Sequence, residues 1–248
     1  MPRADSGTGE GTWRRRAPIA VAIVLVLAAA AVYAATASPL FRARTLNVEG
    51  TGKLGRAQIL HLAQIDTTTN ILWLSGSTVS GRLMASPWVR SATVTKSYPS
   101  TLTISVVERS AVAATESGDS WLALAADGTA LELLKKMPPG LPLIVGAASP
   151  AIGRLSAETT PAATAVGLMN EETRSQVEKV VVAPDGTLRL FLVGGGRVEY
   201  GEAVELKDKA DSLSGILSWA QENHSRIRTV DLTAPAAPAA KVTKTAST

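Results

Sequence analysis

The hydrophobic and polar positions of this chain separate a long apolar run from two patterned blocks. Residues 18–37 contain no charged side chain, and their length matches the helix that a bilayer core requires. Behind this run, residues 44–109 show both helical and extended patterns, whereas the patterns of residues 111–233 are mostly extended. We therefore predict an α+β protein with a single N-terminal transmembrane helix and two further domains.

The first block predicts helices and strands in a fixed order. Residues 44–49 alternate as a short strand, and apolar residues spaced along one helix face predict a short helix from Gly55 and a second over residues 79–85. Two extended segments follow, and Tyr98-Pro99 marks the turn between them. The predicted order is strand, helix, helix, strand, strand, and a single mixed sheet with both helices on one face would bury the apolar positions.

The second block predicts mostly antiparallel strands with one long helix near its C-terminal end. Asp-Gly turns at residues 127–128 and 185–186 separate short extended runs. From Leu206 to Ala220, apolar residues recur at spacings of four and three, which predicts a helix lying on a sheet, and residues 227–232 supply a late strand. Residues 234–248 are rich in Ala, Pro, Thr and Lys and are predicted to be a disordered tail.

Basic residues set the predicted orientation of the apolar run. Arg14, Arg15 and Arg16 precede it directly, and the positive-inside rule places them in the cytoplasm. Residues 1–17 would then form a cytoplasmic tail, and both following domains would lie outside the cell membrane. A second interpretation stays open, because the small residues that end at Ala37 also fit a signal-peptide cleavage site, which would release a secreted protein.

Charge and composition exclude several functions. The formal net charge is +4, from 25 basic and 21 acidic residues, so the chain has no strongly basic stripe for nucleic acid. There is no cysteine, and the exported part must therefore fold by hydrophobic burial without disulfides. The two histidines lie outside any short metal motif, so no metal or cofactor is predicted.

No group of residues identifies an enzyme. A serine could be combined with His224 and Asp231 as a triad, but no G-x-S-x-G motif presents a nucleophile. His224 follows a predicted helix, where a protonated imidazole would favour the helix dipole. We predict a binding protein with no small-molecule substrate, and a membrane-anchored hydrolase that uses His224 is the least favoured alternative.

Aromatic and charged residues also suggest where the domains meet. Trp13 suits a membrane interface, and the other tryptophans, at positions 73, 88, 121 and 219, are predicted to lie in a core or at a domain junction. Glu108-Arg109 is either an exposed ion pair or the hinge between the two domains, and the break in alternation just after it favours the hinge.

A set of short motifs occurs in order behind the apolar run. Together they resemble a POTRA domain, and specifically that of the FtsQ/DivIB family of bacterial cell-division proteins. The resemblance implies a POTRA domain (β-α-α-β-β) at residues 41–110 and the family's β domain at residues 111–233. The motifs are Leu46-Asn47-Val48-Glu49-Gly50, Gln58-Ile59, Pro87-Trp88-Val89, Ala92-Thr93-Val94, Tyr98-Pro99, Ile104-Ser105-Val106-Val107-Glu108-Arg109 and Leu141-Pro142-Leu143-Ile144-Val145-Gly146.

The resemblance implies a function. It predicts a single-pass scaffold at the division septum that binds FtsB/DivIC-type and FtsL-type proteins and helps to control septal peptidoglycan synthesis by FtsW and the FtsI-type transpeptidase. The alternative, which requires cleavage after Ala37, is a secreted binding module for a cell-wall polymer or another extracellular ligand.

The resemblance also suggests the binding residues. In the family a partner adds as a strand at the edge of the late strands of the β domain, a mode that uses unpaired backbone N–H and C=O groups. We assign this edge to Ile227, Thr229, Val230, Asp231 and Leu232; the alternative is an interior or covered strand whose side chains only pack. For the POTRA domain the resemblance implies recruitment contacts near the membrane, with a matching motif at Pro87, Trp88 and Val89; a structural role for these three residues is the favoured interpretation.

Overall fold

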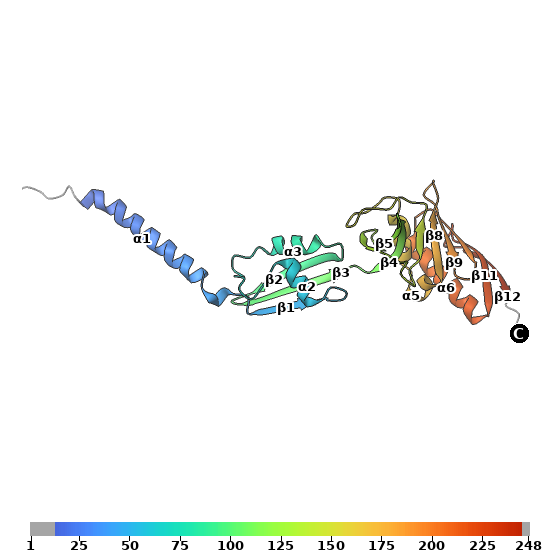
Figure 1. Ribbon diagram of the computed structural model, residues 1–248, viewed down its shortest axis with the longest axis horizontal. Coiled ribbons are helices and arrows are strands. Elements are labelled where there is room, and N and C mark those ends of the chain that lie inside the picture. The colour runs from blue at the N-terminus through green and yellow to red at the C-terminus, as the bar shows by residue number, and fades with distance from the viewer. Residues whose placement is uncertain (1–12, 245–248) are drawn as a thin grey trace, which may run out of the picture.

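The computed structural model describes residues 13–244, with side chains described from residue 21 to residue 243. A long helix, a small domain and a larger domain follow one another along an extended molecule (Figure 1). The helix α1 spans Trp13–Thr36, and a short 3₁₀ turn at Pro39–Phe41 leads into the small domain. Within the described part of the chain, no helix combines the length and the hydropathy needed to cross a membrane. The transmembrane role of residues 18–37 stays a prediction.

The small domain has the predicted order of strand, helix, helix, strand, strand. Its three strands form one sheet in the order β1-β3-β2, with β3 parallel to β1 and antiparallel to β2. The elements are β1 (Thr45–Glu49), α2 (Arg56–Ala63), α3 (Gly76–Met84), β2 (Val89–Ser97) and β3 (Thr101–Glu108).

One face of this sheet forms the core with the two helices. Leu102 and Ile104 of β3 are fully buried, and so are Ile59 of α2 and Leu83 of α3. The alternation along β3 and the helical spacing along α3 bring these residues to the same side, as the sequence pattern predicts. The domain therefore folds around its own apolar cluster.

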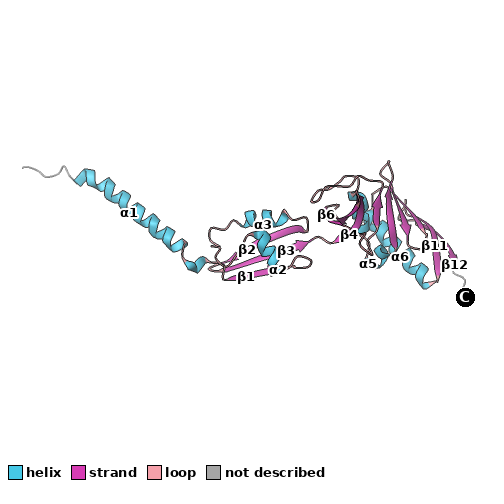
Figure 2. Ribbon diagram, viewed as in Figure 1, coloured by secondary structure: helices cyan, strands magenta, loops and turns pink. Residues whose placement is uncertain are grey.

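The larger domain is built on a mixed nine-stranded sheet, which Figure 2 shows in magenta. The strands lie in the order β12-β11-β10-β9-β8-β7-β4-β5-β6. Its elements are β4 (Ala111–Ser117), β5 (Ser120–Ala125), β6 (Ala130–Leu134), β7 (Leu143–Val145), α4 (Thr160–Gly167), α5 (Glu171–Ser175), β8 (Val177–Val182), β9 (Leu188–Leu192), β10 (Arg197–Gly201), α6 (Leu206–Glu222), β11 (Ser225–Asp231) and β12 (Ala239–Lys244).

Helical crossovers explain two of the three parallel pairs in this sheet, and β5 and β6 lie between the strands of the third pair, β4 and β7. The pairs β10·β11, β4·β7 and β7·β8 are parallel, and the other neighbouring pairs are antiparallel. The helix α6 connects β10 to β11, and α4 and α5 lie between β7 and β8 in the sequence. Parallel neighbours need such a long connection, whereas a tight turn joins antiparallel ones. The prediction of a mostly antiparallel domain is right for the hairpins and misses these crossovers.

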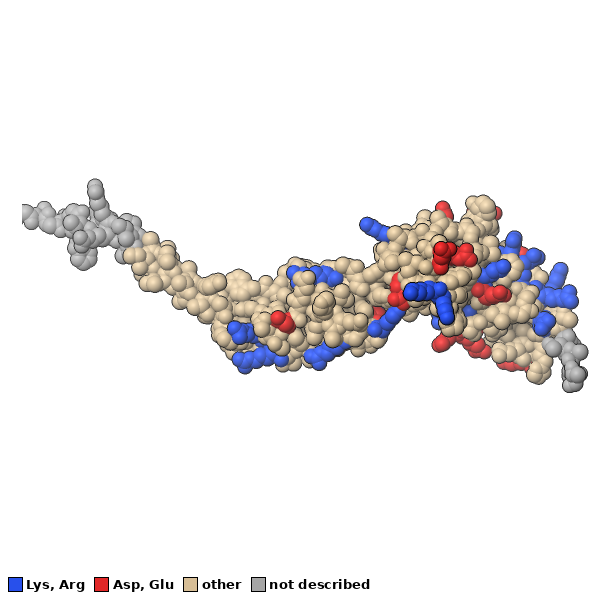
Figure 3. All heavy atoms as spheres, viewed as in Figure 1, with Lys and Arg blue, Asp and Glu red and all other residues tan. Residues whose placement is uncertain are grey.

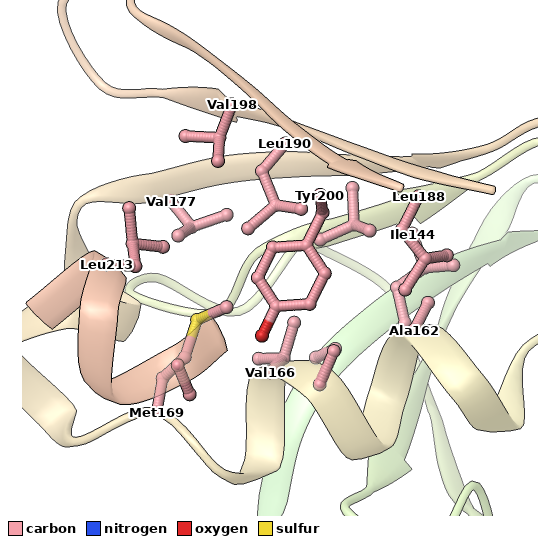
Figure 4. Close-up of a cluster of buried hydrophobic side chains, with 14 of the residues drawn as sticks. Ile144, Ala162, Val166, Met169, Val177, Leu188, Leu190, Val198, Tyr200 and Leu213 are labelled. Atoms are coloured by element: carbon pink, nitrogen blue, oxygen red, sulfur yellow. The ribbon is translucent and has the colours of Figure 1, made fainter. Parts of the chain in front are cut away.

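The core of the larger domain lies between the sheet and the helices α4 and α6. Figure 4 shows Tyr200 of β10 among Val166, Met169 and Leu213, and Tyr200 is fully buried. The Tyr200 hydroxyl donates a hydrogen bond to the Leu206 carbonyl at 3.1 Å. Burial, and secondarily the nearby Asp211, raises the pKa of Tyr200 well above its usual range. The apolar stripe of α6 thus packs as its spacing predicts.

The predicted disordered tail is wrong for part of its length. Residues 239–244 form β12, which pairs antiparallel with β11 from Asp231↔Ala239 to Ser225↔Lys244. Pairing with an existing strand supplies hydrogen bonds that the local composition does not indicate. Residues 1–12 of the predicted cytoplasmic tail and residues 245–248 lie outside the described residues.

Candidate partner-binding edge and domain junction

The strand β11 carries most of the residues that the sequence assigns to the partner-binding edge. It lies between two other strands, with β10 parallel on one side and β12 antiparallel on the other. The placement of the edge at β11 is therefore wrong, because β12 covers its second row of backbone groups. The partner-binding role of these residues stays untested.

The side chains of this assigned set have structural contacts. Ile227, Val230 and Leu232 are buried in the core cluster of the larger domain. Thr229 is half-buried and pairs with Lys241 of β12 across the sheet. The alternative stated for these residues, a covered strand whose side chains pack, describes their geometry.

Asp231 begins the turn that leads from β11 toward β12. Its Oδ1 accepts hydrogen bonds from the Thr233 backbone N–H at 3.0 Å and from the Thr233 hydroxyl at 2.6 Å. These bonds hold the pKa of the Asp231 carboxyl below its ordinary value. The carboxylate is thus occupied by local hydrogen bonds. Aspartate typically forms this kind of turn by accepting a hydrogen bond from the backbone N–H two residues later.

The outermost strand of the described sheet on this side is β12. In the sheet order its only neighbour among the described residues is β11, so one row of its backbone N–H and C=O groups has no strand partner there. Ala239, Lys241 and Val242 are exposed. Such an edge pairs readily with an extended segment of another chain. The sequence signal for β12 was weak, with Val242 and Thr243 the β-branched residues in a run that otherwise reads as a tail.

The junction of the two domains contains the Pro87-Trp88-Val89 motif. Val89 is buried in the core of the small domain, and half-buried Trp88 packs on a cluster of Ala123, Ala125 and Leu131 from the larger domain. The Lys53 ammonium lies over the Trp88 ring, 3.6 Å from its centroid, and also forms an ion pair with Glu132 of β6. The motif therefore joins the domains, which is a structural role.

Arg109 holds this junction through both domains. Its Nη1 donates to the carbonyls of Pro87 at 3.0 Å and Val89 at 2.7 Å, and its Nε donates to Asp127 Oδ2 at 2.8 Å. Glu108, directly before it, accepts the backbone N–H groups of Gly52 and Lys53 at 2.8 Å each. Glu108 and Arg109 thus bind other partners instead of each other, and Arg109 contacts both sides of the position predicted for the hinge.

The electrostatics of the junction depend on Asp127. Burial raises the pKa of its carboxyl. The hydrogen bonds from Arg109 and Thr129 together lower this pKa by more than burial raises it, so the net pKa lies below the ordinary value. Asp127 also lines a groove of about 550 Å³ with Arg90, Arg109 and Thr164. At neutral pH the carboxylate is charged and paired with Arg109, which stabilises the contact between the two domains.

Replacing Arg109 with Ala is expected to loosen the junction. The change removes three hydrogen bonds of a charged donor, each contributing on the order of 1.5–3 kcal/mol when partly buried. We expect at least tenfold faster subtilisin cleavage between residues 108 and 112. Arg90→Ala is the matched control, because Arg90 lines the same groove and is exposed. Equal cleavage rates for the two variants would contradict this role of Arg109.

Acid is expected to loosen the same junction in the wild type. A carboxyl with a lowered pKa in the folded state stabilises it above the ordinary pKa of about 4, and this contribution is lost as the pH falls through the lowered value. Subtilisin cleaves poorly in acid, so the measurement uses pepsin cleavage at this junction between pH 2 and pH 4. Asp127→Asn should remove the pH dependence that is specific to the junction.

The geometry does not support the histidine triad. His224 precedes β11 and Asp231 ends it, and a strand of this length separates its ends by about 20 Å. His224 and His61 are both exposed. Within the described residues, no three His, Asp or Glu side chains gather as a metal site.

Arg14, Arg15 and Arg16, the residues predicted to set the membrane orientation, fall within α1, and their side chains are outside the described ones.

Comparisons with known proteins agree on one family. Residues 41–109 match the family model described as "POTRA domain, FtsQ-type". The chain is 28% identical over 227 residues to the cell division protein FtsQ of Mycobacterium tuberculosis, which covers 91% of this chain and 68% of the relative. It is 33% identical over 107 residues to FtsQ of Bradyrhizobium diazoefficiens, covering 43% of this chain and 31% of the relative.

A solved structure also matches. It is the major extracytoplasmic domain of the trans isomer of the cell-division protein DivIB from Geobacillus stearothermophilus. The match has 17% sequence identity and a TM-score of 0.36, and it covers 46% of this chain and 92% of that chain.

Proposed function

We propose that this chain, which resembles the FtsQ/DivIB family of bacterial cell-division proteins, is a membrane-anchored scaffold of the division machinery. In this proposal it binds FtsB/DivIC-type and FtsL-type proteins outside the membrane and helps to control septal peptidoglycan synthesis by FtsW and the FtsI-type transpeptidase. The observation that supports the proposal best is the edge of β12, which has a strand neighbour on one side only in the described sheet.

The proposed binding mode is strand addition to β12. An extended partner segment would pair with the backbone groups of β12 that face away from β11, and alternate side chains would set the specificity. The buried residues Ile227, Val230 and Leu232 would contribute by holding β11 in place as the template for β12. A second mode, in which the partner displaces β12 and pairs with β11, is distinguished by the deletion described in the Discussion.

The proposed anchor rests on the sequence. Residues 18–37 are uncharged, and Arg14, Arg15 and Arg16 before them favour a cytoplasmic N-terminus. Both domains would then lie outside the membrane, at the division septum. The secreted binding module is the alternative, and it requires cleavage after Ala37.

The POTRA domain is proposed to act in recruitment, while Pro87, Trp88 and Val89 hold it against the β domain. The contacts of these three residues within the chain support the structural part of this assignment. Removing residues 41–110 is expected to abolish septal localisation of a fluorescent fusion. Normal localisation of the shortened protein, at wild-type abundance, would contradict the recruitment role.

Affinity capture from crosslinked membranes tests the scaffold and the anchor together. The tagged full-length protein is captured, its partners are identified by mass spectrometry, and its own N-terminal peptide is sequenced. Recovery of FtsB/DivIC-type and FtsL-type proteins with the residues before Ala37 intact supports the proposal. A protein that begins at Ser38 and brings no division proteins would support the secreted module instead.

A further inference from the structure

Large apolar side chains are exposed where α1 meets the POTRA domain. Trp73 is 65% exposed, Tyr98 57%, Leu40 50%, and Tyr33 near the end of α1 68%. The prediction of a core or junction position is therefore wrong for Trp73, and it is also wrong for Trp219, which is 49% exposed. Single exposed apolar residues are ordinary, but a group of this kind in one place marks an interaction surface.

Backbone hydrogen bonds bring three of these residues to the same end of the domain. The Ile71 N–H donates to the Phe41 carbonyl at 2.9 Å, with Leu40 one residue before Phe41 and Trp73 two residues after Ile71. The Arg44 N–H donates to the Ser100 carbonyl at 2.9 Å, and Tyr98 lies two residues before Ser100. Two residues of chain reach at most about 7 Å, so Leu40, Trp73 and Tyr98 all lie near the first residues of the domain.

The same end is tied directly to the helix. Asn70 Nδ2 donates to the Thr36 carbonyl at 2.8 Å, which satisfies a carbonyl in the last turn of α1. Arg42 also forms a β-bridge with Asn70. Only the short segment between Thr36 and Phe41 separates α1 from the domain, so the position of α1 determines what this end of the domain faces.

Basic side chains accompany the apolar ones. Arg42 and Arg44 are exposed, and among the described residues neither forms an ion pair. Figure 3 shows basic residues on the POTRA domain near the point where α1 joins it. The nearby Asp66 carboxylate already accepts hydrogen bonds from Thr68 and Thr69. The surface combines exposed aromatic rings with cations, which suits the headgroup layer of an anionic membrane.

We infer that Leu40, Trp73 and Tyr98, with Arg42 and Arg44, form a membrane-contact collar that seats the POTRA domain on the headgroups of anionic lipids. The inference rests on the proposed anchor and adds a second contact to it. Aromatic rings lie in the interfacial layer, while the arginine side chains reach the phosphates. Figure 1 shows β12 at the opposite end of the molecule from α1, so a seated POTRA domain would present the binding edge away from the membrane.

The absence of cysteine from the sequence allows a direct test with single labels. The full chain is reconstituted into nanodiscs of phosphatidylcholine, with or without 30% phosphatidylglycerol. A bimane fluorophore is attached to Ser97→Cys beside the collar, to Val26→Cys within the proposed span, or to Gln221→Cys at the end of α6. Spin-labelled lipids then report the depth of each fluorophore by quenching.

The expected pattern distinguishes the collar from the anchor. Headgroup spin labels should quench the fluorophore at residue 97 at least threefold more than that at residue 221, and acyl-chain labels should quench the one at residue 26. Quenching at residue 26 with none at residue 97 would overturn the collar and leave the anchor. No quenching at residue 26 would overturn both.

Matched variants test which side chains make the contact. Trp73→Ser should reduce quenching at residue 97 at least twofold, whereas Trp219→Ser, which removes another exposed tryptophan, should not. Phosphatidylglycerol is expected to increase the quenching at residue 97. Arg42→Gln with Arg44→Gln should remove this increase, whereas Arg90→Gln with Arg226→Gln should retain it. Equal effects within either pair would contradict the assignment of the collar residues.

Discussion

Deleting residues 239–248 is expected to weaken binding of the proposed FtsB/DivIC-type partner at least 100-fold. The deletion removes β12 and with it the backbone groups to which the partner strand would bind. A net contribution of about 1 kcal/mol per hydrogen bond, over three or four bonds, corresponds to a loss of roughly 100-fold to 1,000-fold in affinity. Calorimetry with the full-length protein in detergent measures the effect.

Two controls make this deletion specific. Removing only residues 245–248 leaves β12 complete and should not change the affinity. Lys241→Ala with Val242→Ala keeps the backbone and should cost less than tenfold. Tighter binding after deletion of residues 239–248 would show that the partner displaces β12 and pairs with β11, and unchanged binding would exclude both modes.

A proline within β11 would be a poorer test of the edge. Val230 is fully buried and pairs with Val198 of β10 and Ala240 of β12. Val230→Pro would remove a backbone donor from the interior of the sheet, so a loss of binding would also follow from damage to the fold. The deletion at the end of the sheet avoids this ambiguity.

Gly50→Ala is expected to destabilise the POTRA domain by about 2–5 kcal/mol. Gly50 directly follows β1 with φ +77°, and a Cβ added there would lie 1.9 Å from the Val106 carbonyl oxygen of β3. A left-handed conformation costs an alanine roughly 1–2 kcal/mol, and relief of the clash costs about 1–3 kcal/mol more. For a small domain this is a large part of its total stability.

Hydrogen exchange of the full-length protein measures this loss domain by domain. Protection of β1 and β3 should fall, while protection of the buried strands β8 and β9 should remain. Gly118→Ala is the matched control, because Gly118 has φ +60° and a Cβ there would meet no atom within 4 Å. A loss of protection in β1 and β3 no greater than that caused around Gly118 would refute the steric argument.

The POTRA domain was predictable because its patterns are local and strong. The alternation of Leu102, Ile104 and Val106 identifies the buried face of β3, and the residues of α3 that face it follow helical spacing. Its motifs also carry the family resemblance. Sequence reasoning therefore reached both the order of its elements and the family.

The edge of the larger sheet was not predictable in the same way. Strand order is a property of the whole domain, and nothing within Ile227 to Leu232 indicates that another strand covers it. The residues of β12 resemble a tail in composition, and their extended conformation follows from pairing with β11. The membrane-contact collar was missed for a related reason, since the exposure of Trp73 depends on how its turn sits against Phe41.

In-cell photocrosslinking at β12 tests the proposed scaffold most directly. A photoreactive phenylalanine analogue replaces Val242, which is exposed on β12, and in a control it replaces exposed Leu133 on β6 at the opposite end of the same sheet. The proposal predicts that the full-length protein with the analogue at residue 242 crosslinks to an FtsB/DivIC-type or FtsL-type protein in dividing cells, and that the control does not. No such crosslink at residue 242, from a protein that still supports division, would contradict it.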